Sequence, residues 1–416
     1  MKKAINNIPL ALLLIFAFYV LLLLLRISNG NFYLVDSLEY LEAAKHFLNH
    51  GFFTDLSPIV SKRLFVYPLF LLLSITFNPY VILLFQAVLL YFSFFIFYKI
   101  IEHHKVKLNF IATSFIIATP SLFIYSQLVM SEIIVLFLVT MLFYLFMVNF
   151  SWKKIKYIQI ILVLLAFTKP VFYPFVFVNF FLMLYYFYKV KRFNFWIFLP
   201  VTAVLLYINY NDYKFGNKHF SSMENKNLIH YNLYYFKSSS ESKQVADNWI
   251  SEIDRKVENL NDAQKNKIYK SIAKEEISNH FLAYSWYQFL TGIRGVIDPG
   301  RFDLMTFYKK EDGKQGFLKI LNGNKSWKIL FSNTSVLVIY FFLIPIFLFS
   351  LLKWFFFVKF FVSKKRDFSN YYILILIIYS VLVTGPVNCS RYMMPLQLII
   401  ITFTLLSINK KHISAN

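Results

Sequence analysis

Long apolar runs alternate along this chain with short loops that are rich in lysine and arginine. A helix that crosses a membrane needs about 20 mostly apolar residues, because the hydrocarbon core is about 30 Å thick. We therefore predict about ten transmembrane helices, at roughly residues 8–25, 80–101, 108–127, 132–150, 155–169, 170–188, 194–210, 331–352, 370–386 and 392–408. The pattern predicts an all-α polytopic membrane protein. The helix boundaries between 155 and 188 are left open, because prolines interrupt that run.

One apolar block, at 64–77, is only about 14 residues long and too short to cross the membrane comfortably. If it crossed, the loop at 102–107 would lie outside and every later basic loop would be inverted. If it dips into the outer leaflet, all the basic loops are cytoplasmic, as the positive-inside rule requires. These loops contain Lys105 and Lys107, Lys153, Lys154 and Lys156, Lys189, Lys191 and Arg192, Lys364, Lys365 and Arg366, and Lys410 and Lys411. We predict cytoplasmic chain ends and an outer loop at 26–79.

The region 211–330 is too polar for the membrane and holds 14 of the 21 acidic residues. Apolar residues recur at helical intervals through its centre, which predicts amphipathic helices over the outer mouth of the membrane part. The aromatic cluster at 284–287 resembles an anchor at the lipid–water interface. We thus divide the chain into an N-terminal membrane module (1–210), an extracytoplasmic helical region (211–330) and C-terminal transmembrane helices (331–416). Lys353 and Lys359 are expected at the inner interface.

The stretch at 35–68 differs from its surroundings, because it is acidic and amphipathic between two apolar blocks. Asp36 and Glu39 have the spacing of a capping box, in which Asp36 caps the first turn and Glu39 reaches back. The apolar residues that follow recur at helical spacing. The stretch is expected to form a short helix lying flat at the membrane surface.

Composition agrees with this class of protein. Apolar residues make up 58% of the 416 residues and charged residues only 15%, whereas a soluble chain has about a quarter charged residues. The net charge of +22 is explained by the cytoplasmic loops and does not indicate nucleic-acid binding. A single cysteine, Cys389, excludes an internal disulfide and argues against a Cys-based metal site. His103 and His104 lie in a basic inner loop and indicate a solvated face.

The predicted outer face gathers two kinds of charged residue. Asp36 and Glu132 are carboxylates suited to accepting a proton, and Arg63, Lys169 and Arg391 are cations suited to stabilising a departing phosphate. Each has a simpler interpretation: a helix cap for Asp36, a dipole-favoured charge for Glu132, snorkelling for Lys169. A solute transporter would place its charges near the bilayer midplane on broken helices. The set therefore favours group transfer from a phosphate-bearing donor.

Several short motifs occur in the order typical of one enzyme superfamily. They are Asp36-Ser37-Leu38-Glu39-Tyr40, Gly51-Phe52-Phe53, Arg63 with Tyr67-Pro68, Ser131-Glu132, Thr168-Lys169-Pro170 and Arg391-Tyr392-Met393-Met394-Pro395. In this order the chain resembles the GT-C glycosyltransferases, in particular the branch of lipid-A aminoarabinose transferases and protein O-mannosyltransferases. The resemblance extends over about the whole membrane portion, with the motifs in the same order.

The resemblance implies a GT-C-like bundle that transfers a sugar from a polyprenyl-phosphate donor with inversion. Asp36 would be the catalytic base or would orient the acceptor, and Glu132 stands where the family has a second acid. The donor phosphate would be held by Arg63, Lys169 and Arg391. The aromatic residues Tyr40, Tyr67 and Tyr392 would shape the substrate site.

Two departures from the family matter. Ser37 replaces the acid that often follows the first aspartate, so a carboxylate-paired metal site is not indicated, although a divalent metal is left open. No sizeable soluble domain is expected after the last span, so acceptor recognition would fall to 211–330. No cofactor is predicted beyond the lipid-linked donor.

We thus expect a multi-pass enzyme of the bacterial plasma membrane, with its active site on the extracytoplasmic side. Its partners would be the bilayer, a polyprenyl-phosphate sugar and a lipid, glycan or protein acceptor. Two alternatives stay open: a flippase for lipid-linked glycans, and a glycan polymerase or ligase that uses diphosphate-linked donors.

Overall fold

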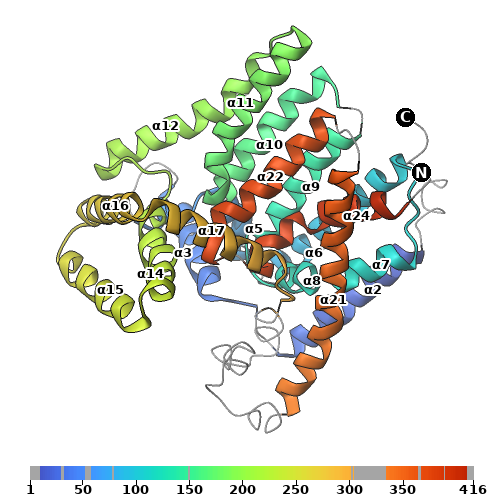
Figure 1. The fold of residues 1–416 in the computed structure, drawn as a ribbon, viewed down its shortest axis with the longest axis horizontal. Helices are drawn as coiled ribbons and strands as arrows, with labels where there is room; N and C mark the ends of the chain where they lie inside the picture. The colour runs from blue at the N-terminus through green and yellow to red at the C-terminus, as the bar shows by residue number, and fades with distance from the viewer. Residues whose placement is uncertain are drawn as a thin grey trace.

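A computed structural model of the chain describes residues 10–29, 32–51, 58–76, 79–148, 150–300, 303, 334–363, 367–387 and 389–409. Within these ranges every regular element is a helix (Figure 1), so the all-α prediction is confirmed there. The basic loops at 364–366 and 410–411, on which the topology argument partly depends, lie outside the described residues.

The main body consists of long apolar helices packed side by side. They are α2 (Leu10–Asn29), α6 (Pro79–His103), α9 (Glu132–Met147), α10 (Ile155–Thr168), α11 (Tyr173–Val190), α12 (Phe198–Phe215), α21 (Thr334–Val362), α22 (Phe368–Thr384) and α24 (Gln397–Ile408). Among the described residues, five helical segments are long and apolar enough to cross a membrane, or six if one bent pair is a single span. The structure thus has the features of a multi-pass membrane protein. The count of ten crossings stays a prediction.

The segment predicted as one span at 108–127 is broken, so that prediction is wrong in its geometry. Helix α7 (Phe110–Ile117) and helix α8 (Pro120–Ile124) meet at an angle of 66°. Pro120 has no N–H and disfavours helical backbone at the residue before it. The Thr119 hydroxyl donates instead to the Phe115 carbonyl oxygen at 2.8 Å. The break opens space between α8 and α21, and the chain then continues through η1 (Tyr125–Gln127) towards α9.

Helix α3 (Val35–His50) is followed by α4 (Pro58–Lys62) and α5 (Val66–Thr76), and α3 packs against α5. The predicted capping box is wrong: the N-cap is Leu34, and the Leu34 N–H donates to Ser37 Oγ at 2.9 Å. Asp36 is therefore inside the first turn, and its carboxylate is not used to cap the helix. Helix α5 has 11 residues, which corresponds to about 16 Å and agrees with a block that does not cross.

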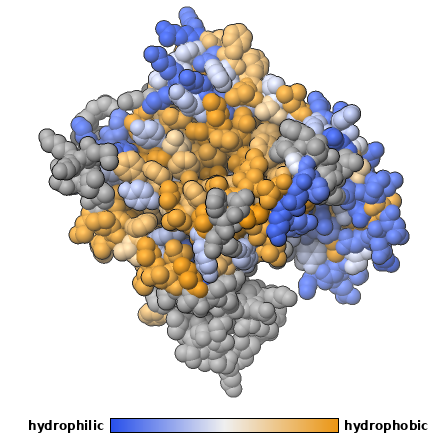
Figure 2. Space-filling view, turned by 180° about the vertical axis from the view of Figure 1, so that it is seen from behind, coloured by the Kyte–Doolittle hydropathy of each residue, from blue (hydrophilic) through white to orange (hydrophobic). Residues whose placement is uncertain are grey.

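The polar region forms a layer at one side of the body. Its helices are α13 (Met223–Asn227), the π-helical η5 (Leu228–Leu233), α14 (Tyr234–Ser240), α15 (Lys243–Val257), α16 (Asp262–Asn279) and α17 (Phe281–Val296). Figure 2 shows hydrophilic residues over this part and apolar residues over much of the body. Ile229, Leu233 and Phe236 belong to a separate small core, against which Tyr284 and Tyr287 pack. Of the predicted aromatic anchor, Trp286 is the residue that is well exposed.

Several hydrogen bonds attach this layer to the body, two of which lie at its opposite ends. The Ser222 N–H donates to the Ser61 carbonyl oxygen at 3.1 Å, next to α4. Helix α17 lies against the end of α22, where the Gln288 side chain donates to the Leu382 carbonyl oxygen at 3.0 Å. The layer therefore covers the end of the body that carries α3 and α4.

Candidate active site

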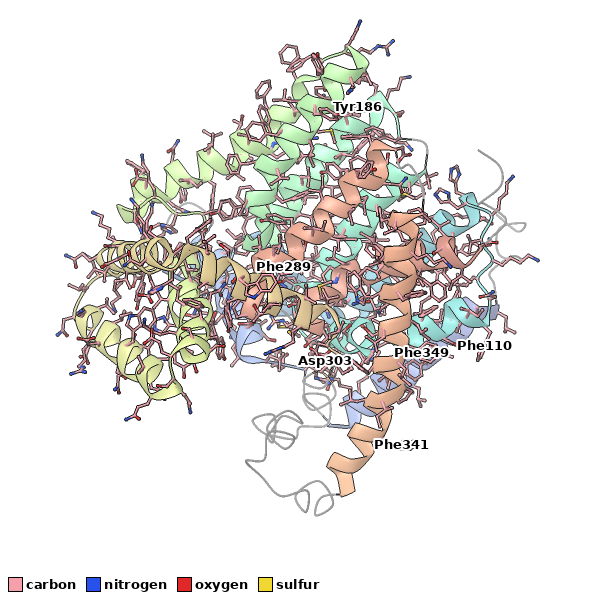
Figure 3. All side chains as sticks on the ribbon, in the orientation of Figure 1. Phe110, Tyr186, Phe289, Asp303, Phe341 and Phe349 are labelled. Carbon is pink, nitrogen blue, oxygen red and sulfur yellow. The ribbon has the colours of Figure 1, made fainter. Side chains whose placement is uncertain are left out.

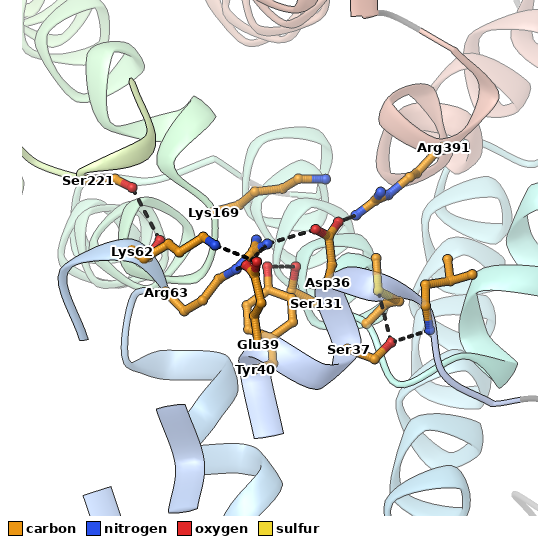
Figure 4. A network of polar contacts seen from close by, with 12 residues as sticks. Asp36, Ser37, Glu39, Tyr40, Lys62, Arg63, Ser131, Lys169, Ser221 and Arg391 are labelled. Carbon is orange, nitrogen blue, oxygen red and sulfur yellow. Dashed lines mark hydrogen bonds and ion pairs between the residues drawn. The ribbon is translucent and has the colours of Figure 1, made fainter. Parts of the chain in front are cut away.

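Asp36 lies at the centre of a cluster of ion pairs between α3, α4 and α23 (Ser390–Met393). Its Oδ1 accepts a hydrogen bond from the Arg63 guanidinium at 2.7 Å. Its Oδ2 accepts one from Arg391, also at 2.7 Å. Figure 4 shows Asp36 between these two arginines. The interpretation of Asp36 as a helix cap is thereby contradicted, because both carboxylate oxygens bind side-chain cations.

Glu132 is the first residue of α9, and its side chain is fully buried. Its Oε1 accepts from Arg391 Nε and from Lys169 Nζ, the latter at 3.2 Å. Among the described residues its Oε2 has no hydrogen-bond partner. Leaving a charged oxygen buried without a partner is costly. Lys169 is paired and mostly buried, which contradicts the snorkelling interpretation.

The three predicted tyrosines differ in their relation to the ion pairs. The Tyr40 ring lies 4.8 Å from the Arg63 guanidinium carbon, and its hydroxyl is 3.0 Å from Ser131 Oγ. Lys169 Nζ lies 4.6 Å above the Tyr392 ring. Both rings therefore hold cations through their faces.

Tyr67, in contrast, lies behind the cluster. It is fully buried, its ring packs edge-on against Tyr40 at 4.8 Å, and its hydroxyl donates to Gln86 at 3.0 Å. The Gln86 amide in turn donates to two backbone carbonyl oxygens. These contacts indicate that Tyr67 supports the Tyr40 ring. They do not indicate the substrate binding that was predicted from the sequence.

Two charged residues of the cluster were not among the predicted site residues. Glu39 accepts from Arg63 Nε at 2.7 Å and also pairs with Lys62. Glu39 follows Asp36 by three positions, a spacing that places both carboxylates on one helix face. We predicted a capping box from this spacing, whereas in the structure it brings Glu39 into the cluster as a second carboxylate beside Asp36. Lys62, adjacent to the predicted Arg63, carried no such spacing signal.

The cluster has an excess of positive charge. Four cations, Lys62, Arg63, Lys169 and Arg391, surround three carboxylates, Asp36, Glu39 and Glu132. With all groups ionised, the sum is one net positive charge. The site can therefore bind one additional negative charge, after which its positive and negative charges are equal in number.

Electrostatics also decides the protonation of Asp36. Burial by itself raises the pKa of this carboxyl, but the nearby Arg391 and Arg63 guanidiniums outweigh burial and lower it to about 2. Burial likewise raises the pKa of Glu39, and Lys62 and Arg63 lower it overall. In the free protein Asp36 is therefore fully deprotonated at neutral pH and a weak base.

A pH dependence of stability follows from the lowered pKa of Asp36. The folded-state value of about 2 lies below the ordinary value of 3.8, so the stabilisation from Asp36 is complete above the ordinary value and is lost as pH falls towards 2. We expect the stability difference between the wild type and Asp36→Asn in detergent to be constant from about pH 7 to 5 and to shrink between about pH 4 and 2. Thermal unfolding of both proteins across this range measures it. A difference that already shrinks between pH 7 and 5 would contradict the lowered pKa.

The described residues contain no group of three His, Cys, Asp or Glu side chains arranged to hold a metal ion. Comparisons of the chain with protein-family models, with curated proteins and with solved structures give no match. The geometry of the site is therefore the basis for assigning a function.

Proposed function

We propose that this protein is an integral-membrane glycosyltransferase that moves a sugar from a polyprenyl-phosphate donor to an extracytoplasmic acceptor, with inversion. The supporting observation is the cation-rich ion-pair cluster around Asp36, at one end of an apolar helical body. The proposal includes a GT-C-like bundle of about ten spans in a bacterial plasma membrane, with the cluster on the outer side.

In the proposed reaction, an acceptor hydroxyl or amine attacks the anomeric carbon on the face opposite the phosphate. Asp36 takes the proton that the acceptor loses. The bond between the anomeric carbon and the phosphate oxygen breaks, and its electron pair leaves with the polyprenyl phosphate. Arg63, Arg391 and Lys169 stabilise the charge that develops on this leaving group.

The lowered pKa of Asp36 fits an ordered sequence of events. A carboxylate with a pKa of about 2 is a poor base while both arginines bind it. A donor phosphate that binds Arg63 and Arg391 competes for these hydrogen bonds and neutralises their charge. Asp36 then becomes more basic because the interactions that lowered its pKa are weakened. In this sequence the donor binds before the acceptor loses its proton.

The charge balance favours a monophosphate donor over a diphosphate donor. A sugar-linked phosphodiester carries one negative charge, which equals the net positive charge of the seven clustered residues. A diphosphate carries two and would leave one uncompensated in a partly buried site. A glycosyltransferase with a monophosphate donor is therefore favoured over the diphosphate-dependent polymerase or ligase.

Replacing Lys169 with alanine is expected to weaken donor binding by about 10-fold, the effect of losing one charge-assisted hydrogen bond. The acceptor KM is expected to stay unchanged, because Lys169 pairs with Glu132 and not with Asp36. Steady-state kinetics with varied donor concentration measures the effect, and Lys243→Ala, at an exposed position of α15, is the matched control. Equal donor affinity in the wild type and Lys169→Ala would contradict the assignment.

The proposal as a whole is tested with purified protein, radiolabelled polyprenyl-phosphate sugar and a panel of lipid, glycan and protein acceptors. A transferase forms a new glycosidic bond in detergent. A flippase moves the lipid-linked sugar across a bilayer without forming a product. Transport in proteoliposomes without product in detergent would favour the flippase.

A further inference from the structure

Buried charged residues outside the ion-pair cluster are candidates for a further role, because burying a charge is costly. Lys353, which the sequence predicts at the inner interface, is buried, and this corrects that prediction. Its ammonium donates to Gln397 Oε1 and to Thr119 Oγ1 at 3.3 Å. Asp303 lies near α8 and α21 (Figure 3), and the cavity that it lines with Lys353 has a volume of about 20 Å³, enough for about one water molecule. Lys353 therefore joins helices to one another and has no room for a ligand beside it.

Glu224, in α13, has both of its carboxylate oxygens occupied. Oε1 accepts from the Ser221 N–H at 2.7 Å, and Oε2 accepts from the Tyr173 hydroxyl at 3.1 Å. Ser221 lies just before α13, whereas Tyr173 begins α11 of the membrane body. A helix cap would involve only the contact with Ser221. The contact with Tyr173 means that Glu224 also fixes the start of the polar layer on the body.

The segment that Glu224 fixes holds α4 in turn. The Ser222 N–H donates to the Ser61 carbonyl oxygen at 3.1 Å, and the Ser221 hydroxyl donates to the Lys62 carbonyl oxygen at 3.3 Å (Figure 4). Ser221 and Ser61 are buried, so these hydrogen bonds are shielded from water. Helix α4 has only five residues, and a helix this short is not stable by itself. Its position therefore depends on contacts with other elements.

The position of α4 matters because it carries two cations of the cluster. Lys62 is the last residue of α4, and Arg63 follows directly. Both side chains pair with Glu39. The other two cations, Lys169 and Arg391, lie directly after α10 and on α23. The spacing between the four cations therefore depends on where α4 is held.

We propose that Glu224 is a positioning residue for the phosphate site. Through Ser221 it holds α4, and with it Arg63, where the guanidinium binds the phosphate together with Lys169 and Arg391. Misplacing a binding group by about 1 Å is enough to weaken a site strongly. This role rests on the proposed function, since it takes the cluster as the site of the donor phosphate. It also connects the polar layer to that site without adding a charge to the cluster.

Binding of radiolabelled farnesyl phosphate to the full-length protein in nanodiscs tests this role, with farnesol as the neutral control for partition into lipid. Glu224→Ala removes both hydrogen bonds and is expected to weaken binding about 10-fold, the effect of losing one charge-assisted hydrogen bond of Arg63. Glu224→Gln is expected to bind within about 3-fold of the wild type, because its amide oxygen accepts from Ser221 and its amide nitrogen donates to the Tyr173 hydroxyl. The matched control is Glu276→Ala, which removes a partly buried carboxylate of the same layer, 2.7 Å from Lys237. It is expected to bind like the wild type.

A double variant shows whether Glu224 acts through Arg63. In the Arg63→Gln background, adding Glu224→Ala is expected to weaken binding by less than about 3-fold, because two changes that act on one interaction are not additive. Thermal unfolding shows which variants are folded, and only folded variants are compared. Tyr173→Phe keeps the ring and removes only the hydroxyl that Glu224 binds. It is expected to weaken binding about 3-fold and tests the role even if Glu224→Ala does not fold.

Several outcomes overturn this inference alone. They are wild-type affinity in Glu224→Ala and Tyr173→Phe, an equal loss in Glu224→Gln and Glu224→Ala, and a full 10-fold further loss in the Arg63→Gln background. An equal loss in Glu276→Ala also overturns it, because the effect would then come from general loosening of the polar layer. Farnesyl phosphate that binds to the wild type no better than farnesol rejects the phosphate site, and with it both the proposed function and this role. The expected affinities without sugar transfer to any acceptor reject the proposed function and support the role of Glu224.

Discussion

Replacing Asp36 with asparagine lowers the turnover number for sugar transfer by about 10²–10⁴-fold, the contribution typical of a general base. The substitution keeps the size of the side chain but removes its ability to take a proton. It also raises the net charge of the cluster by one unit, so donor binding is expected to be retained or strengthened. Transfer assays with radiolabelled donor, together with donor titrations, separate the two effects.

The matched control for this prediction is Glu42→Gln, which removes a carboxylate from an exposed position of the same helix, α3. It is expected to leave turnover unchanged. Turnover within a few-fold of the wild type in Asp36→Asn would remove Asp36 as the base. A joint loss of turnover and donor binding would instead assign Asp36 to organising the arginines.

Arg391→Leu is expected to have the largest effect on stability, because Arg391 joins the two buried parts of the cluster. It binds Asp36 Oδ2 at 2.7 Å and Glu132 Oε1. Removing one partner of a buried ion pair costs about 3–5 kcal/mol. Donor binding is expected to weaken by about 10–100-fold, as a charge-assisted hydrogen bond contributes about 1.5–3 kcal/mol. Thermal unfolding in detergent and donor titration measure the two losses.

A double variant separates these losses from each other. In Arg391→Leu the Glu132 carboxylate keeps only Lys169 as a partner. Adding Glu132→Gln removes this buried charge while its amide oxygen can still accept from Lys169, so part of the lost stability is expected to return. Donor binding is expected to stay weak because the cation is still absent. Arg294→Leu, at an exposed position of α17, controls for loss of an arginine elsewhere. Recovery of donor binding in the double variant would show that Arg391 acts through stability only.

The sequence and the structure agree most closely where a prediction depends on local pattern. The apolar runs correctly predicted α6, α22 and α24 within a few residues. The start of α3 was not predicted, because it depends on a hydrogen bond of the Ser37 side chain. The bend between α7 and α8 was also not predicted, although Pro120 favours a break there. The predicted site residues do meet in space, except that Tyr67 stands behind Tyr40. Their catalytic roles stay predictions.

The sequence by itself determined that the chain is helical and apolar enough for a membrane, and that few acids lie outside the polar region. Hydrophobicity and periodicity are properties of residues that are close in the sequence, so they can be predicted from the sequence alone. Only the tertiary structure decided which acid meets which cation. Asp36 and Arg391 are 355 residues apart in the sequence, and the tertiary fold brings α3 and α23 close enough for these two side chains to pair. Burial of Glu132 and Lys353 was decided in the same way, because the position of surrounding helices, and not the local sequence, removes water from a side chain.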